Sequence, residues 1–592
     1  MVNKFLITTG LEETWETNKS ILFLGEWCRL HSRKKKWENM GGELVHYHWD
    51  NREKLFNDYK SITEIYERIL ADLCKELNTR HGVDHDLRYW RILIGPWLGY
   101  FTGIFYDRWF MIDFVSKKTS LSTIILTGMD EEFIPNDMAS FMKLFVDDEW
   151  NHFIFGKIIR NYSSIEIIEK NRTKKKALHT KKIKLTKKQK IKRAIAFFYS
   201  KIANISAGSK GAFFITTHLQ IRNLLKLFWH FRQLPILPNL AVPDRIKPDF
   251  NQRNWEVPGS SYSEFEDLLR KMIPQQIPIA YLEGYSQLVA KSKNMGWPKH
   301  PSILFTSNSY SSDDIFKTYA AEHRKKGTPF VIGQHGGHYG SGKWSMTEDH
   351  EIAVSDKYLS WGWVDPLRPK IKPVGQIKIL KYQGETYNKK SGMLLITHTA
   401  PRYSYVMFSG VVAGQWLEYL NDQFSFVQAL TEKTRNQLIV RLYKNDYGFN
   451  QHARWKEKFP SLKYDFAVHK MEELMSTCRI FVSTYNATTY LESISVNIPT
   501  VIYWNPKHWE IRDNAIPFFE ELKAVKIFHE TPESAAQHIN DIWNNVDAWW
   551  NSENVRQSVN RFRNYYCYPA SDLIERIETE LRSVYVETVS LP

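Results

Sequence analysis

Short runs of hydrophobic residues, each followed by a polar loop, recur along the chain. In the first half, such runs cover residues 4–9, 21–24, 43–48 and 122–127. Runs of this length are typical of buried strands, and strands that alternate with helices predict a parallel sheet with helices on its faces. The loops at the carboxyl ends of the strands then share one edge of the sheet, where α/β proteins bind ligands.

A second series of strands and helices begins after residue 350. Its predicted strands cover residues 358–361, 371–374, 393–397, 437–442, 479–482 and 500–504. A chain of 592 residues is also too long for one hydrophobic core. We therefore expect an α/β protein with two Rossmann-like domains that face a cleft, one over residues 1–350 and one over residues 351–592.

A glycine-rich loop with two histidines follows the predicted strand at residues 330–332. The loop contains Gln334, His335, Gly336, Gly337 and His338. Glycine lets the backbone turn tightly and approach a ligand, while histidine and glutamine supply hydrogen-bond donors and acceptors. Polar residues in this place predict a ligand site, with His335 and His338 as candidate catalytic groups. A structural turn with exposed histidines is the alternative.

A loop rich in hydroxyl groups follows the predicted strand at residues 479–482. This loop and the start of the next helix contain Ser483, Thr484, Asn486, Thr488 and Thr489. A helix amino terminus carries free backbone N–H groups and a partial positive charge, which suit a phosphate. Glu492 falls one turn later, placed to accept hydrogen bonds from ribose hydroxyls. The pattern predicts a nucleotide site, although an ordinary helix cap would use similar residues.

The segment RIFVSTYNATTYLESISVNIPTVIYW, residues 479–504, resembles the nucleotide-binding segment of GT-B glycosyltransferases. In that fold a strand, a Ser/Thr loop, a helix with a glutamate and a turn with proline hold the phosphate and ribose of the donor. The wider chain resembles a family of bacterial transferases of O-antigen and other surface-polysaccharide loci. The matching passages are FLITTGLEETW, ILFLGEWCRL, HWDNREKL and IGQHGGHYG.

The resemblance implies a GT-B-like glycosyltransferase that moves a sugar from a nucleotide donor to a surface-polysaccharide or lipid-linked glycan. Similarity to transferases of Kdo and other nonulosonic acids implies a CMP-linked donor. Where enzymes of that kind carry a His-Pro pair, this chain has Arg441-Leu442-Tyr443-Lys444, so Arg441 and Lys444 would take the phosphate role. GT-B enzymes usually stabilise the leaving group with protein groups, which implies a metal-independent enzyme with no cofactor besides its donor.

Glycosyl transfer needs cations or N–H groups at the leaving phosphate and a base or carboxylate at the reacting centre. His398, Arg441 and Lys444 follow predicted strands of the second half and are candidates for the phosphate. Glu13 and Glu26 follow strands of the first half, beside tryptophans suited to stack on sugar rings, and are candidate catalytic carboxylates. Surface salt bridges and packed core tryptophans are the alternatives.

Two other functions fit the same pattern. One is a polyol-phosphate transferase of the teichoic-acid type with a CDP donor, and the other is a non-catalytic carbohydrate- or membrane-binding protein. No metal site is predicted, because His335 and His338 have no nearby carboxylate or cysteine partner in the sequence.

Part of the net charge of +15 lies in a Lys-rich segment, Lys174–Arg193, within an insertion at about residues 165–200. A solvated face is one interpretation, and contact with anionic lipid at the inner membrane surface is another. We expect no nucleic-acid partner, because no nucleic-acid-binding motif accompanies the charge. The uncharged residues 92–106 fall short of the about 20 residues that a membrane span needs, so they predict a buried helix.

The four cysteines form no CxxC pair, which favours neither a zinc site nor a disulfide scaffold. This cysteine usage is typical of a reducing compartment, and the amino terminus does not resemble a signal peptide. We therefore expect a cytoplasmic protein, peripheral at the inner face of the plasma membrane if the Lys-rich segment binds lipid.

Overall fold

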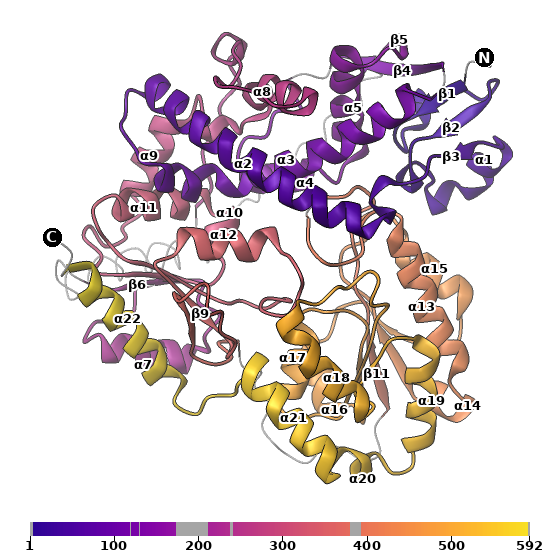
Figure 1. Ribbon diagram of the computed structural model, residues 1–592, viewed down its shortest axis with the longest axis vertical. Coiled ribbons are helices and arrows are strands. Elements are labelled where there is room, and N and C mark those ends of the chain that lie inside the picture. The colour runs from indigo at the N-terminus through magenta and orange to yellow at the C-terminus, as the bar shows by residue number, and fades with distance from the viewer. Residues whose placement is uncertain are drawn as a thin grey trace, which may run out of the picture.

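Three parallel β-sheets carry the fold (Figure 1). The computed structural model describes residues 4–118, 120–128, 131–172, 211–236, 241–378, 392–405 and 407–589. The strand pairs in each sheet are parallel. The prediction of a parallel α/β protein is confirmed, and the described residues form three sheets where two were expected.

The first sheet has the strand order β3-β2-β1-β4-β5. Its strands are β1 (Lys4–Ile7), β2 (Ile21–Phe23), β3 (Glu43–Leu44), β4 (Leu121–Thr127) and β5 (Glu166–Asn171). The helices of this region are α1 (Lys34–Asn39), α2 (Arg52–His81), α3 (Leu87–Ser116), α4 (Met138–Leu144) and α5 (Asp148–Tyr162). The order is that of a doubly wound, Rossmann-like sheet, in which the winding reverses between the first and fourth strands.

The second sheet, β10-β9-β8-β7-β6, follows the order of the chain. Its strands are β6 (Phe213–Ile215), β7 (Leu304–Thr306), β8 (Phe330–Gly333), β9 (Lys357–Ser360) and β10 (Ile371–Pro373). Its helices are α7 (Ile221–His230), α8 (Glu264–Gln276), α9 (Tyr285–Lys293), α10 (Ser309–Ser312), α11 (Asp314–Arg324) and α12 (Met346–Val354). The boundary expected at residue 350 falls inside this sheet, because β9 pairs with β8 and continues it.

The third sheet has the order β13-β12-β11-β14-β15-β16, again that of a Rossmann-like sheet. Its strands are β11 (Met393–Ile396), β12 (Leu438–Arg441), β13 (Lys463–Asp465), β14 (Ile480–Ser483), β15 (Thr500–Tyr503) and β16 (Phe528–His529). Its helices are α13 (Gln415–Ala429), α14 (Glu432–Arg435), α15 (Gln451–Lys458), α16 (Met471–Thr477), α17 (Thr488–Ser495), α18 (Ile516–Ala524), α19 (Pro532–Ile542), α20 (Val546–Trp550) and α21 (Glu553–Tyr566). The winding reverses between β11 and β14, which makes their carboxyl ends the expected binding crevice.

The last helix, α22 (Leu573–Val589), returns from the third sheet to the second. Figure 1 shows α22 in yellow beside α7 and β9. Ion pairs fix it there: Glu578 Oε2 lies 2.5 Å from His230 Nδ1, and Glu580 Oε2 lies 3.3 Å from Lys357 Nζ. The second and third sheets are therefore joined both by the chain between them and by its return.

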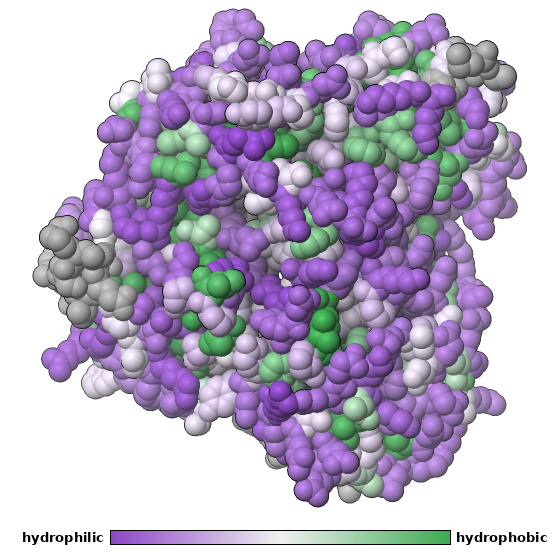
Figure 2. All heavy atoms as spheres, in the orientation of Figure 1, coloured by the Kyte–Doolittle hydropathy of each residue, from purple (hydrophilic) through white to green (hydrophobic). Residues whose placement is uncertain are grey.

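Residues 92–106 lie within α3, whose side chains in this stretch are almost all buried. The helix packs against α2, α5 and α11, so the prediction of a buried helix is confirmed. Within the described ranges, no helix is long and apolar enough to cross a bilayer. The predicted Lys174–Arg193 segment lies outside the described residues. On the face drawn in Figure 2, most of the surface is hydrophilic and hydrophobic side chains gather only in small groups.

Candidate functional site

The two loops singled out from the sequence meet between the second and third sheets. The loop after β8 places the backbone N–H of Gly337 2.7 Å from Thr488 Oγ1, which accepts its hydrogen bond at the start of α17. A Cβ on Gly336 would lie only 2.4 Å from the same hydroxyl oxygen, so this approach requires glycine. The Ser341 hydroxyl also donates to Asn486 Oδ1 over 3.4 Å.

The remainder of this loop is held rigidly. Gly342 forms an antiparallel bridge with Ile511, and the Arg512 N–H donates to the Ser341 carbonyl over 2.9 Å. The Arg512 guanidinium donates to both carboxylate oxygens of Glu348 at 3.0 Å. Glu348 is 1% exposed, and such a charge-assisted contact with a buried carboxylate fixes the loop against the third sheet.

Several polar atoms at this junction are buried without a hydrogen-bond partner among the described residues, among them His335 Nδ1, His338 Nε2, His398 Nε2 and Asn486 Nδ2. A buried polar atom without a partner costs about 1–3 kcal/mol, so a group of them is unusual outside a ligand site. Burial lowers the pKa of His335, His338 and His398 to about 4, which leaves the imidazoles neutral at pH 7. The junction thus offers uncharged donors and acceptors.

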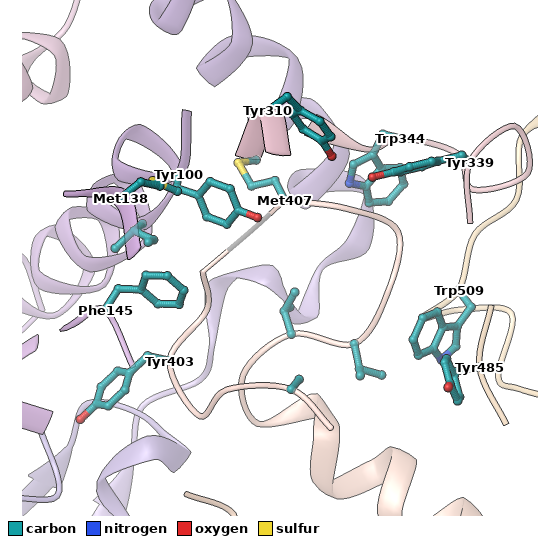
Figure 3. Packing of buried hydrophobic residues seen from close by; sticks show 14 of the residues in the cluster. Tyr100, Met138, Phe145, Tyr310, Tyr339, Trp344, Tyr403, Met407, Tyr485 and Trp509 are labelled. Carbon is teal, nitrogen blue, oxygen red and sulfur yellow. The ribbon is translucent and has the colours of Figure 1, made fainter. Parts of the chain in front are cut away.

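Aromatic rings line the side of this junction that belongs to the third sheet. The ring of His398, just after β11, lies 5.1 Å from that of Tyr485 and 5.5 Å from that of Trp509. Figure 3 shows Tyr485 and Trp509 side by side. These residues follow β11, β14 and β15, so aromatic rings gather at the carboxyl ends of the strands where the winding reverses.

Glu351, on α12, lies behind His335 and is completely buried. Its Oε1 is 3.7 Å from His335 Nδ1 and accepts hydrogen bonds from the hydroxyls of Tyr339, over 2.7 Å, and Tyr310. Burial raises the pKa of Glu351 to about 8, although the tyrosine hydroxyls act in the opposite direction. Glu351 was not among the residues predicted from the sequence; a glutamate in a helical segment, followed by Ile352 and Val354, was the available signal.

The amino terminus of α17 has no side-chain cap. Its N-cap residue is Ala487. The first backbone N–H groups of such a helix attract anions, and the buried Nδ2 of Asn486, with its residue 1% exposed, provides a further donor beside them. One turn on, Glu492 Oε1 lies 2.7 Å from Lys378 Nζ, a residue after β10 that the sequence analysis also missed.

Several predicted ligand residues instead hold the scaffold. Thr484 Oγ1 donates to the Ile396 carbonyl over 2.9 Å and ties β14 to β11. Ser483 Oγ donates to the Tyr485 carbonyl over 3.4 Å, and Thr489 Oγ1 donates to the Tyr485 hydroxyl over 3.3 Å. Gln334 is fully buried, and its Oε1 accepts from Trp361 N at 3.0 Å and from Trp363 Nε1 at 2.9 Å.

The remaining predicted residues lie in the first sheet or at and after the end of β12 in the third. Glu13 and Glu26 follow β1 and β2 of the first sheet, and Glu26 lines a separate cavity of about 460 Å³ with Gly414. Arg441 Nη1 lies 2.5 Å from Asp465 Oδ2 and 2.9 Å from the His469 carbonyl, which holds it at β13. Lys444 is exposed. The structure brings together the 335–338 loop, His398 and residues 486–492. Glu13 and Glu26 lie in the first sheet instead, Arg441 is held by Asp465, and Lys444 lies on the surface.

Comparison with known proteins gives one family and several partial likenesses in structure. No curated protein matches the sequence. A chain described as a UDP-N-acetylglucosamine 2-epimerase from Listeria monocytogenes is 11% identical, with a TM-score of 0.35, over 67% of this chain and 95% of its own. Wall teichoic acid polymerase TagF soaked with CDPG is 10% identical, with a TM-score of 0.32, over 69% of this chain and 100% of its own. MurG of Acinetobacter baumannii is 11% identical, with a TM-score of 0.30, over 51% of this chain and 78% of its own.

Likenesses at such TM-scores carry no inference about the reaction. The family match is of another kind, because it spans residues 4–581 and so covers nearly the whole chain and all three sheets. The resemblance to a bacterial transferase family is thereby confirmed: the chain belongs to the LIC12162 family of transferases.

Proposed function

We propose that this transferase moves a sugar from a nucleotide donor to a hydroxyl group of a surface-polysaccharide or lipid-linked glycan. The observation that carries the proposal is the meeting of the His335–His338 loop with the uncapped amino terminus of α17. One side of this junction suits a phosphate, and the other suits proton transfer at a hydroxyl.

The leaving nucleotide is assigned to α17. Its first backbone N–H groups and Asn486 Nδ2 would donate to the phosphate on which negative charge develops during transfer. The Lys378–Glu492 pair, one turn further along, would hold the ribose hydroxyls through the carboxylate. These groups provide the leaving-group stabilisation that the sequence analysis had assigned to Arg441 and Lys444.

His335 is assigned as the base. A neutral imidazole can accept the acceptor's hydroxyl proton at Nε2 when its Nδ1 carries the hydrogen that points toward Glu351. The imidazolium that forms would then lie beside the ionised Glu351 carboxylate, which stabilises it electrostatically. His338 lies against the Phe408 ring at 5.5 Å and is assigned a binding contact with the sugar.

A CMP-linked ulosonic acid is the donor we propose, on the basis of the sequence resemblance to nonulosonate transferases. Calorimetric titration with CMP, CDP, UDP and GDP tests both the nucleotide site and its base preference. We expect CMP to bind most tightly, and Asn486→Ala to weaken binding about tenfold, as expected for a lost hydrogen bond to a charged group.

Asn445→Ala is the matched control, because Asn445 is exposed on the loop after β12. It should bind CMP as the unaltered protein does. A protein that binds none of the four nucleotides would refute the proposed function, and tighter binding of CDP would redirect it to polyol-phosphate transfer.

A further inference from the structure

A cavity of about 90 Å³ lies between α2, α3, α10 and α12, close to the His335 site. Its walls are mostly apolar and include Ile62, Tyr100, Met346 and Met407. This volume exceeds the about 10–15 Å³ that a cavity needs to hold a single water molecule. Figure 3 shows Tyr100, Met407 and Tyr310 near one another at this place.

The wall supplied by α3 consists of residues that weaken a helix. Gly95, Pro96 and Gly99 line the cavity from the interior of α3. Glycine and proline both lower helix stability in such positions. A Cβ at Gly99 would lie 3.1 Å from Met346 Sδ and 3.7 Å from its methyl carbon, with the next atom at 3.8 Å. The nearest of these atoms belong to a flexible methionine, so glycine at position 99 mainly leaves space beside α3.

Polar atoms without a hydrogen-bond partner in the described part of the chain also lie on the wall of the cavity. His350 Nε2 is buried without a hydrogen-bond partner among the described residues. The Tyr66 hydroxyl is close by, since a Cβ built on Gly95 would lie 2.9 Å from Tyr66 Oη and 3.0 Å from His350 Cε1. A neutral imidazole nitrogen and a phenol together suit a single oxygen that can both donate and accept.

The rim of the cavity is fastened by polar pairs. Arg91 donates to both carboxylate oxygens of Glu67 at 2.5 Å, and the Tyr59 hydroxyl donates to Asp349. These pairs join α2 to α3 and to α12, so they hold the three helices together around the cavity. The Tyr310 ring forms part of the wall, and the hydroxyl of the same residue donates to Glu351.

We propose that this cavity binds a small apolar group that carries one hydroxyl oxygen, with the oxygen at His350 and the apolar body against α3. The site is separate from the nucleotide site and extends beyond the proposed function. Its occupant would contact Tyr310, and thus one of the two tyrosines that hold Glu351 beside His335.

The test uses 4-fluorophenol, with fluorobenzene as the matched probe that lacks the oxygen, and follows binding to the full chain by ¹⁹F NMR. We expect 4-fluorophenol to bind and fluorobenzene to bind about fivefold more weakly, as for one lost hydrogen bond. His350→Phe should remove this difference between the probes. Equal binding of the two probes to the unaltered protein, or none by 4-fluorophenol, would overturn the proposal.

Gly99→Leu tests the location, because its side chain would fill the cavity. It should weaken 4-fluorophenol binding at least about tenfold while CMP binding, measured by calorimetry, stays unchanged. Gly82→Ala, in the turn after α2 where a Cβ meets nothing within 4 Å, is the control. It should leave the binding of both 4-fluorophenol and CMP unchanged. If Gly99→Leu fails to fold, the milder Gly99→Ala replaces it. Full binding of 4-fluorophenol by a folded Gly99 variant would contradict the assigned place.

Discussion

His335 Nδ1 lies 3.7 Å from Glu351 Oε1 at the junction of the second and third sheets. The separation exceeds a hydrogen bond, and catalytic contacts of this kind often shorten only when substrate is bound. Burial favours the neutral form of both partners, because it lowers the pKa of His335 and raises that of Glu351. When His335 takes up a proton, the positive charge on its imidazolium is therefore balanced if Glu351 is ionised.

Loss of the proposed base should abolish transfer without unfolding the protein. We expect His335→Ala to lower kcat about a thousandfold, the usual contribution of a general base, and to change CMP affinity little. The melting temperature should stay close to that of the unaltered protein, since Nδ1 of His335 makes no hydrogen bond to the described residues. A large fall in melting temperature would instead assign His335 a structural role.

The pH dependence of transfer should follow Glu351. Its ionised form stabilises the imidazolium, and its pKa is raised to about 8, so kcat should rise as the pH increases through about 8. Glu351→Gln should lower kcat and remove this rise, because glutamine does not ionise. The exposed Glu575→Gln is the control and should retain the profile. An unchanged profile in Glu351→Gln would exclude Glu351 as the positioning residue for His335.

The raised pKa of Glu351 also predicts a pH dependence of stability, which can be measured without substrate. The folded pKa of about 8 lies above the ordinary value of 4.5, so the contribution of this group to stability is complete below about pH 4.5 and is lost as the pH rises through 8. The loss amounts to several kcal/mol in the free energy of unfolding. Glu351→Gln should therefore gain stability relative to the unaltered protein between pH 5 and 8, as measured by urea unfolding. If the difference in the free energy of unfolding between the two proteins stays constant from pH 5 to 8, the pKa of Glu351 is not raised.

The partly buried histidines should make the junction sensitive to acid. His338 has a folded pKa of about 4 against an ordinary 6.5, chiefly through burial, so its contribution is present above pH 6.5 and lost as the pH falls toward 4. His338→Gln should reduce the acid loss in the free energy of unfolding by about 3 kcal/mol. His46→Gln, whose histidine side chain is 78% exposed, should leave the loss unchanged. If His338→Gln and His46→Gln lose the same amount of stability in acid, groups other than His338 cause the loss.

Local patterns predicted both loops that the structure brings together. Hydrophobic runs bounded by polar loops predicted the strands that carry His335 and Asn486, and parallel topology then required both loops to lie at carboxyl edges. The membership of strands in sheets was not predictable in this way, because β9 and β11 look alike as short buried runs. Only the pairing of β9 with β8 shows that the second sheet continues past residue 350.

Contacts between residues far apart in the sequence explain both the residue that was overlooked and the one that was wrongly assigned. Arg441 appeared available at a strand end, but Asp465, on the neighbouring strand, holds it. Glu351 was overlooked because it lies in a helix, and its importance depends on Tyr310 and Tyr339 from other segments. Neither partner can be inferred from the spacing of residues in the sequence.

The approach of Gly336 to Thr488 gives the sharpest test of the junction itself. A Cβ on Gly336 would lie 2.4 Å from Thr488 Oγ1, so Gly336→Ala should push the loop away from α17 and weaken CMP binding about a hundredfold or more. Gly327→Ala is the matched control, because that glycine also has a positive φ, of 87°, but a Cβ there meets nothing within 4 Å. Backbone strain is thus present in both variants, and the steric contact in only one.

A double-mutant cycle then separates the contact from other effects of the substitution. Thr488→Ala removes the hydroxyl and methyl groups that a Cβ at position 336 would meet, at the cost of the acceptor for the Gly337 N–H. The double variant should therefore bind CMP better than Gly336→Ala alone, with a coupling free energy of about 1–3 kcal/mol. Additive effects in the cycle would mean that the two loops do not meet in solution, and the assignment of His335 and α17 to one site would then be wrong.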